Sequence, residues 1–166
     1  MTSSQSKRFG KWLNLAPPQT RYLGSRVEQI LVPSLERLGF VWPGASRLLV
    51  DQPVSGRELE LERASGEFVD TVAFNFDKYR RPRFQINVAR RAASPPHAFL
   101  RTCNIVANSS QYYYFWGAPW WFPTALWSSQ RTDRLIEASE SRLAQADQFL
   151  ANGQTGPNIS KPINLV

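Results

Sequence analysis

The chain has 166 residues, of which 42% are apolar and 20% are charged. This is enough apolar sequence for one domain with a single core, and it excludes a wholly disordered chain. The single cysteine excludes an intrachain disulfide and a cysteine-based zinc site, and 20 Lys and Arg residues against 13 Asp and Glu residues give a formal net charge of +7.

Residues 1–20 are polar and contain two adjacent prolines, which predicts a flexible N-terminal arm. Lys7, Arg8 and Lys11 lie in this arm, but the apolar segment of a secretory signal does not follow them. The longest strongly apolar stretch, residues 112–122, is shorter than the about 20 residues that cross a bilayer. We therefore expect a cytoplasmic protein without a transmembrane segment.

Apolar residues recur at helical spacing over residues 21–38, which predicts the first helix. Pro33 lies inside this pattern, so we expect the helix to kink there or to consist of two shorter pieces. Gly39 fits a C-terminal cap, and Phe40 is the apolar residue that commonly accompanies such a cap.

Four segments with strand character follow, and they predict an antiparallel sheet of four to five strands. These segments are residues 46–51, 57–63, 67–77 and 83–91. Ser65-Gly66 joins the second and third segments as a short hairpin turn. Because one helix precedes this sheet and another follows it, the sequence predicts an α+β fold.

The last two of these strands define their own register when Asp77 is paired with Arg83 and residues 78–82 form the loop. Every residue then faces a matching one, in the pairs Phe76–Phe84, Phe74–Ile86, Val72–Val88 and Asp70–Arg90. A slip of one residue would move every Phe to the other face of the sheet, so this register is strongly favoured.

The remaining chain contains weaker patterns and one clear helix. Residues 94–106 begin with Ser-Pro-Pro and are expected to form a short helix, whereas residues 112–116 have strong strand propensity. The second clear helix is predicted from about residue 129 or 132 to residue 151, where Asn-Gly ends it. We therefore expect one domain over residues 21–153, followed by a C-terminal tail over residues 154–166.

The net charge is concentrated in residues 78–130, which hold seven Lys and Arg residues, no Asp or Glu, and twelve of the 21 aromatic residues. Single-stranded nucleic acids are bound by this combination, since cations contact phosphates and rings stack on bases. The candidate binding residues are Tyr79, Arg80, Arg81, Arg83, Arg90, Arg91, Tyr112, Tyr114, Trp120 and Trp121. Lys78, Arg80 and Arg81 should lie at an exposed turn, because charged groups outside a core remain hydrated or bind an anion. The alternative interpretation is that the rings belong to the core and the arginines cover apolar surface.

The sequence does not contain a recognisable arrangement of catalytic residues. His97 and Cys103 lie six residues apart, which places them on opposite sides of the helix expected there. Glu58, Glu60 and Glu62 share one strand face, but an open face does not drive their pKa values apart as acid/base catalysis requires. With no phosphate-binding loop or metal-ligand spacing either, we expect a non-enzymatic protein without cofactor or metal.

The run from Ile30 to Phe40, with its Leu-Gly-Phe step after an apolar helix, and the strand Phe84–Val88 resemble the bacterial family called domain of unknown function 4304. The resemblance spans roughly residues 25–150. It implies a small α+β domain and supplies no catalytic residue.

Two functions follow from these patterns as expectations. The first is a non-enzymatic bacterial interaction domain, such as an immunity-like or accessory protein, that meets a protein partner. The positive charge argues against a basic nuclease as that partner. The second is single-stranded nucleic-acid binding through residues 78–130. A weaker third interpretation is contact of the Trp- and Tyr-rich segment, residues 112–127, with a membrane surface. Whether that segment is core or an exposed patch, and the oligomeric state, stay open at this point.

Overall fold

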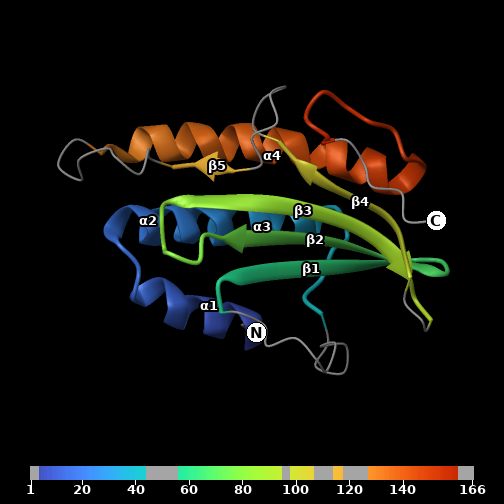
Figure 1. Ribbon diagram of the computed structural model, residues 1–166, viewed down its shortest axis with the longest axis horizontal. Helices are drawn as coiled ribbons and strands as arrows, with labels where there is room; N and C mark the ends of the chain where they lie inside the picture. Colours follow the sequence, from blue (N-terminus) through green and yellow to red (C-terminus); the bar gives the residue numbers. More distant parts are fainter. Residues whose placement is uncertain (1–3, 44–55, 95–97, 107–113, 118–126, 161–166) are drawn as a thin grey trace.

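The computed structural model describes residues 4–43, 56–94, 98–106, 114–117 and 127–160. It confirms the predicted α+β class: an antiparallel sheet of five strands has helices before and after it in the chain (Figure 1). The strands are β1 (Glu58–Ser65), β2 (Phe68–Phe76), β3 (Arg83–Ala92), β4 (Phe99–Ile105) and β5 (Phe115–Trp116). Strands β1 to β4 are neighbours in sequence order, and β5 pairs with the start of β3. The first strand expected from the sequence, residues 46–51, lies outside the described residues.

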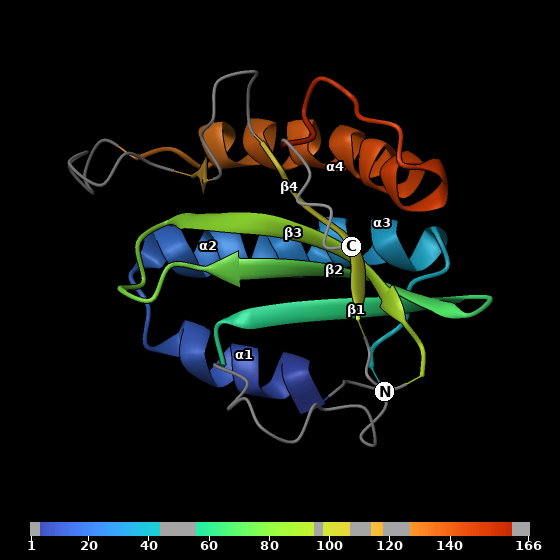
Figure 2. The same ribbon diagram turned by 45° about the vertical axis from the view of Figure 1, so that its right-hand side comes forward.

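The helical elements are α1 (Ser4–Asn14), α2 (Pro18–Arg26), a π-helical turn η1 (Val27–Leu31), α3 (Val32–Arg37) and α4 (Ser129–Asn152). The run from α2 to α3 and helix α4 pack beside each other and cover one face of the sheet (Figure 1). Figures 1 and 2 both place α1 along β1, at the opposite edge of the sheet from α4. The core lies between the sheet and these helices, and includes Leu23, Leu31, Leu35, Phe74, Phe84, Ile86, Phe115, Ile136 and Leu150. Within the described part of the chain, no helix is long and apolar enough to cross a bilayer.

The predicted pairing of β2 with β3 is confirmed residue by residue. The register contains the pairs Asp70–Arg90, Val72–Val88, Phe74–Ile86 and Phe76–Phe84. The Phe76 and Phe84 rings stack with their centroids 5.6 Å apart, and the Phe84 ring stacks in turn on Phe115 of β5 at 5.2 Å. A continuous aromatic row therefore ties the β2–β3 hairpin to the start of β5.

The first long helix is continuous from Pro18 to Arg37, and the break expected at Pro33 takes the form of η1. Proline lacks the N–H of a regular helix, and its ring collides with the carbonyl four residues before it. A π-helical turn immediately before the proline accommodates both defects without ending the helix. The predicted cap is confirmed, because Gly39 has a φ of 85° and the Phe40 N–H donates to the Leu35 carbonyl over 3.1 Å.

Residues 1–20 are not a flexible arm as expected, because residues 4–14 form helix α1. Phe9 and Leu13, one helical turn apart, are buried, and the Phe9 ring lies 4.9 Å from that of Phe76. Gln5 of α1 also accepts a hydrogen bond from the Glu60 N–H, on the outer edge of β1. The apolar stripe of α1 is short and lies among polar residues, so the sequence pattern does not predict a helix. Packing of this stripe against the sheet stabilises the helix.

Residues 99–105 form strand β4 and not the short helix expected there. Strand β3 is long, and its free edge offers backbone groups that need partners. The alternating buried residues Cys103 and Ile105 fit that edge, so pairing with β3 outweighs the helix-start signal of Ser-Pro-Pro. The second predicted helix is confirmed as α4, with Gly153 in the left-handed region at its end.

The outer edge of β4 is covered in turn by residues of the predicted C-terminal tail. Asn104 and Ser160 exchange hydrogen bonds of 2.8 and 2.9 Å, and Ile159 forms a β-bridge with Ile105. The Asn158 side chain donates to the Val106 carbonyl and accepts from Gln145 of α4. Tail residues as far as Ser160 are therefore part of the folded unit.

Candidate functional site

The turn between β2 and β3 extends from one end of the sheet and is organised by Asp77 (Figure 1). The Tyr79 N–H donates to Asp77 Oδ1 over 2.8 Å, and the Arg80 N–H donates to the Asp77 carbonyl over 2.9 Å. The Arg83 Nε–H donates to Asp77 Oδ2 over 2.6 Å. One buried carboxylate therefore binds the backbone of the turn at Tyr79 and the side chain of Arg83 at its far end.

Arg80 has a φ of 58°, and it is the one described residue other than glycine in the left-handed region. This conformation costs a non-glycine residue roughly 1 kcal/mol. Thr20 of α2 stabilises it by donating its hydroxyl to the Arg80 carbonyl over 2.7 Å. The turn is thus fixed to α2 at its most strained residue, and Arg80 itself is half-buried, not fully exposed as expected.

Tyr79 is exposed in this turn, with 66% of its surface accessible to solvent. Lys78 Nζ lies 4.8 Å and the Arg81 guanidinium 5.4 Å from the centre of its ring. Lys78 and Arg81 are exposed, as the sequence predicted. An exposed ring between two cations is suited to a ligand that combines negative charge with a flat apolar group.

Arg83 was expected to bind a ligand, but the structure places it in an internal role. Its guanidinium pairs with Asp77 and lies 4.0 Å from the centre of the Tyr114 ring and 4.5 Å from that of Trp116. The Gly117 N–H, just after β5, donates to the Pro82 carbonyl. Arg83 therefore connects the turn to the rings of Tyr114 and Trp116, and both Arg83 and Tyr114 are half-buried.

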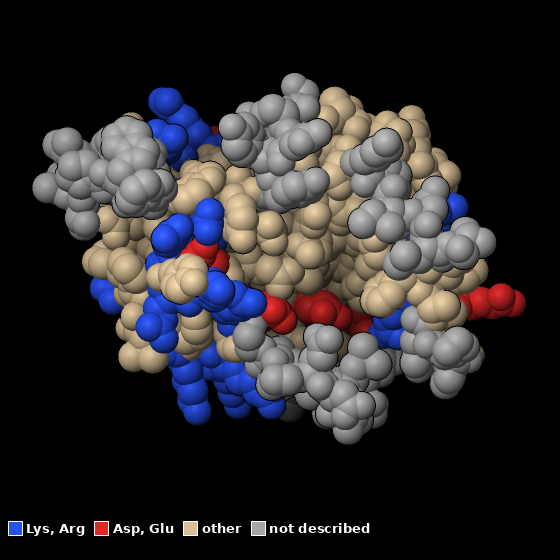
Figure 3. Space-filling model, viewed as in Figure 1, with Lys and Arg blue, Asp and Glu red and all other residues tan. Residues whose placement is uncertain are grey.

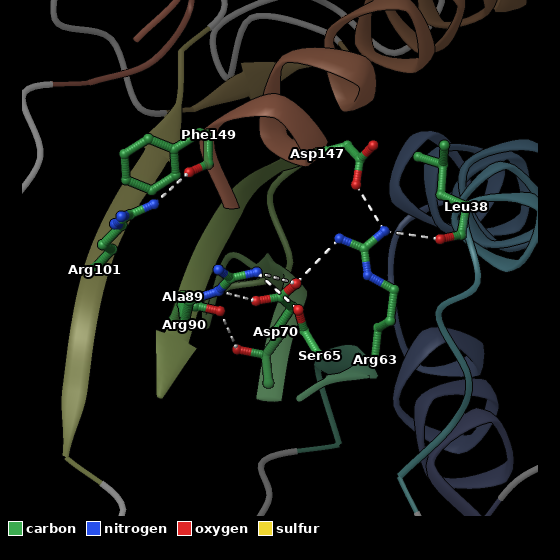
Figure 4. Close-up of polar contacts among 10 residues, drawn as sticks. Leu38, Arg63, Ser65, Asp70, Ala89, Arg90, Arg101, Asp147 and Phe149 are labelled. Atoms are coloured by element: carbon green, nitrogen blue, oxygen red, sulfur yellow. Dashed lines mark hydrogen bonds and ion pairs between the residues drawn. The ribbon is translucent and has the colours of Figure 1, made fainter. Parts of the chain in front are cut away.

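Arg90 is likewise engaged, in a cluster on the core face of the sheet (Figure 4). Its Nε–H and Nη2–H donate to the two oxygens of Asp70 over 2.6 and 3.0 Å, and the Asp70 side chain is fully buried. Arg63 Nη2 donates to the same carboxylate over 3.1 Å, and Arg63 Nη1 reaches Asp147 of α4 over 2.7 Å. Burial alone would lower the pKa of Arg63, but hydrogen bonds to Asp147 and Asp70 outweigh it and raise this pKa, so the Arg63 guanidinium keeps its charge.

Arg63 of this cluster and the nearby Arg101 of β4 also donate hydrogen bonds to the carbonyl ends of two helices. Arg63 Nη1 donates to the Leu38 carbonyl at the end of α3, and Arg101 Nη1 donates to the Phe149 carbonyl near the end of α4 (Figure 4). Terminal carbonyls lack partners within their own helix and carry partial negative charge. The cluster therefore joins the sheet to its covering helices and has a structural role.

Arg91 lies on the other face of the sheet and is also buried. Its guanidinium is 3.8 Å from the carboxylate of Glu62, which is buried as well. The neighbouring Glu60 has its pKa raised by burial and by the charges of Glu62 and Glu58, partly offset by Arg91. Of the arginines expected to bind a ligand, Arg81 is exposed and Arg80 half-buried at the turn, whereas Arg83, Arg90 and Arg91 are paired inside the fold.

The thiol of Cys103 is buried on β4, and this burial raises its pKa to about 12. The group is therefore a neutral thiol at physiological pH and not an activated nucleophile. Among the residues that the structure describes, no three His, Cys, Asp or Glu side chains lie close enough together to hold a metal ion. His97, Tyr112, Trp120 and Trp121 lie outside the described residues.

Helix α1 adds cations that the sequence analysis did not assign to the site. Its Lys7, Arg8 and Lys11 are exposed, while the Phe9 and Trp12 rings contact Phe76, the last residue of β2. Figure 3 shows Lys and Arg side chains gathered over the β2–β3 turn and over the side of the molecule where α1 lies.

A sequence signal for these cations does exist. Residues 1–27 contain five Lys and Arg residues and no Asp or Glu. The nine acidic residues of positions 1–77 all follow residue 27, so the charge of the first 77 residues taken together is balanced and does not reveal this basic segment.

Comparison with protein-family models, with curated proteins and with solved structures found no match to this chain. The resemblance to domain of unknown function 4304 therefore stays a prediction.

Proposed function

We propose that this protein is a non-enzymatic binding domain that recognises an acidic macromolecule through one basic end of the molecule. The basic end consists of the β2–β3 turn and the exposed side of α1. Its residues are Lys7, Arg8, Lys11, Lys78, Tyr79, Arg80 and Arg81. An immunity-like or accessory role in a bacterium is one form of this proposal, and the sign of the surface favours an acidic partner.

The observation that carries the proposal is the absence of exposed negative charge from these described segments. Residues 4–27 contain no Asp or Glu, and the one carboxylate at the turn, that of Asp77, is buried and paired with Arg83. The cations of the basic end therefore have no exposed carboxylate within their own two segments, and Glu28, which accepts a hydrogen bond from Ser6 of α1, is half-buried. Such a single-sign surface attracts polyanions over about one Debye length, roughly 8 Å at physiological salt.

Binding to three polyanions tests this proposal: heparin, polyglutamate and an oligonucleotide, each at about 50 mM salt, where charge attraction is strong. We expect at least one to bind, and we expect Arg81→Gln to weaken that binding several-fold. The matched control is Arg37→Gln, which removes the same charge from an exposed residue at the far end of α3, about 25 Å along the helix from Thr20. If none of the polyanions binds, or if both variants weaken binding equally, the basic end is not a binding site.

A further inference from the structure

We infer that the partner of the basic end is a single-stranded nucleic acid, and that Tyr79 stacks on one of its bases. This inference rests on the proposed function, which it narrows to one class of polyanion. Single-strand binding proteins combine cations that follow the backbone with aromatic side chains that stack on bases. The turn offers this combination within four consecutive residues, 78–81.

The ring of Tyr79 is exposed to solvent and is not part of the hydrophobic core. The hydrophobic core includes the rings of Phe74, Phe76, Phe84 and Phe115, whereas Tyr79 keeps 66% of its surface exposed. Its backbone is nevertheless held by the hydrogen bond from its N–H to Asp77. A fixed backbone lowers the entropy that is lost when a base stacks on the ring.

The cations beside the ring match the chemistry of a nucleotide strand. Lys78 and Arg81 precede and follow Tyr79 in the chain, and both lie within 5.4 Å of its ring centre. Each base of a strand is flanked by two phosphates, so a base on the ring brings a phosphate toward each of these flexible side chains. Arg80 is a third cation in the same turn. Its backbone is in the left-handed conformation, which glycine would adopt with less strain.

An unpaired strand fits this arrangement better than a duplex or an acidic protein. In a duplex the bases are stacked on each other, so a ring at the surface cannot reach their faces without unstacking them. An acidic protein segment supplies carboxylates but no regular series of flat rings. The exposed ring distinguishes these partners, because cations alone attract all three alike.

Helix α1 extends the path of the strand beyond the turn. Phe9 and Trp12 hold α1 against Phe76, the last residue of β2 before the turn, and Lys7, Arg8 and Lys11 are exposed on the same helix. Lys7 and Lys11 are four residues apart and share one helical face, with Arg8 beside them. The turn thus binds a base with its phosphates, and α1 contacts the phosphates that follow.

The test compares a fluorescent oligothymidylate of about 15 nucleotides with an abasic strand of the same length, which keeps the phosphates but lacks the bases. We expect the wild-type protein to bind oligothymidylate about 5- to 100-fold more tightly, the range expected for one to a few stacked bases. Tyr79→Leu should remove this preference while retaining affinity for the abasic strand, and Tyr79→Trp should restore it. Unchanged circular dichroism shows that each variant is folded.

The outcomes separate this inference from the proposed function. If both strands and polyglutamate bind equally and Tyr79→Leu has no effect, the basic end binds an acidic partner of another class, such as a protein, and the inference is wrong. Tighter binding of a duplex than of oligothymidylate also overturns it. If no polyanion binds at all, the proposed function itself is wrong.

Discussion

Asp77 and Arg83 form a buried ion pair across the base of the β2–β3 turn, with Arg83 Nε 2.6 Å from Asp77 Oδ2. The same carboxylate accepts the Tyr79 N–H, and the same guanidinium lies against the Tyr114 and Trp116 rings. One pair therefore connects the exposed ring of Tyr79 to the interior of the protein.

We expect Asp77→Ala to lower the free energy of unfolding by about 3 kcal/mol, because it leaves the Arg83 charge in the fold without its partner. The measurement is urea denaturation followed by circular dichroism. Arg37→Gln breaks an exposed pair with Glu140 and should cost less than about 1 kcal/mol. Similar midpoints for Asp77→Ala and the wild type would show that the pair does not hold the turn.

Arg80→Gly should separate stability from binding. Glycine adopts the left-handed conformation without strain, which offsets its greater freedom in the unfolded chain. We expect the free energy of unfolding to stay within about 1 kcal/mol of the wild type, whereas polyanion affinity falls. Arg80→Val is the contrasting variant, because a branched side chain is disfavoured at this φ, and it should lower stability as well. Equal stability of the Gly and Val variants in urea would contradict the strain at Arg80.

Removing cations from α1 should affect long strands more than short ones. We expect the double variant Lys7→Gln and Lys11→Gln to weaken binding of an oligonucleotide of about 15 nucleotides and to reduce its salt slope by about 1.4, or about 0.7 for each lost phosphate contact. A strand of about four nucleotides, held by the turn alone, should bind the variant and the wild type alike. Equal losses for both lengths, measured by fluorescence anisotropy, would exclude α1 as an extension of the site.

The raised pKa of Cys103 predicts that stability depends on this thiol at alkaline pH. The thiol ionises near 9.0 in the unfolded chain and near 12 in the fold, so the unfolded state binds fewer protons between these values. The free energy of unfolding should therefore fall between about pH 9 and 12 more steeply in the wild type than in Cys103→Ala. Parallel pH profiles in thermal melts would indicate that Cys103 is accessible to water.

Patterns of side-chain spacing determined much of this fold. The β2–β3 register followed from the alternation of Phe and Val with polar residues, and it placed Asp77 opposite Arg83 and Asp70 opposite Arg90. Helix α4 followed from a long apolar stripe and its final Asn-Gly. These features depend on residues close together in the chain, whose relative positions the period of a helix or strand already defines.

Only the tertiary structure decided which cations face solvent. Arg83, Arg90 and Arg91 are the same residue type as Arg81, but in the fold they pair with Asp77, Asp70 and Glu62 and are mostly buried. Helix α1 and strand β4 likewise take their form from the sheet edges that they cover. The physical reason is that an ion pair or an edge contact depends on segments distant in sequence, whereas periodicity reports only which face of its own element a side chain occupies.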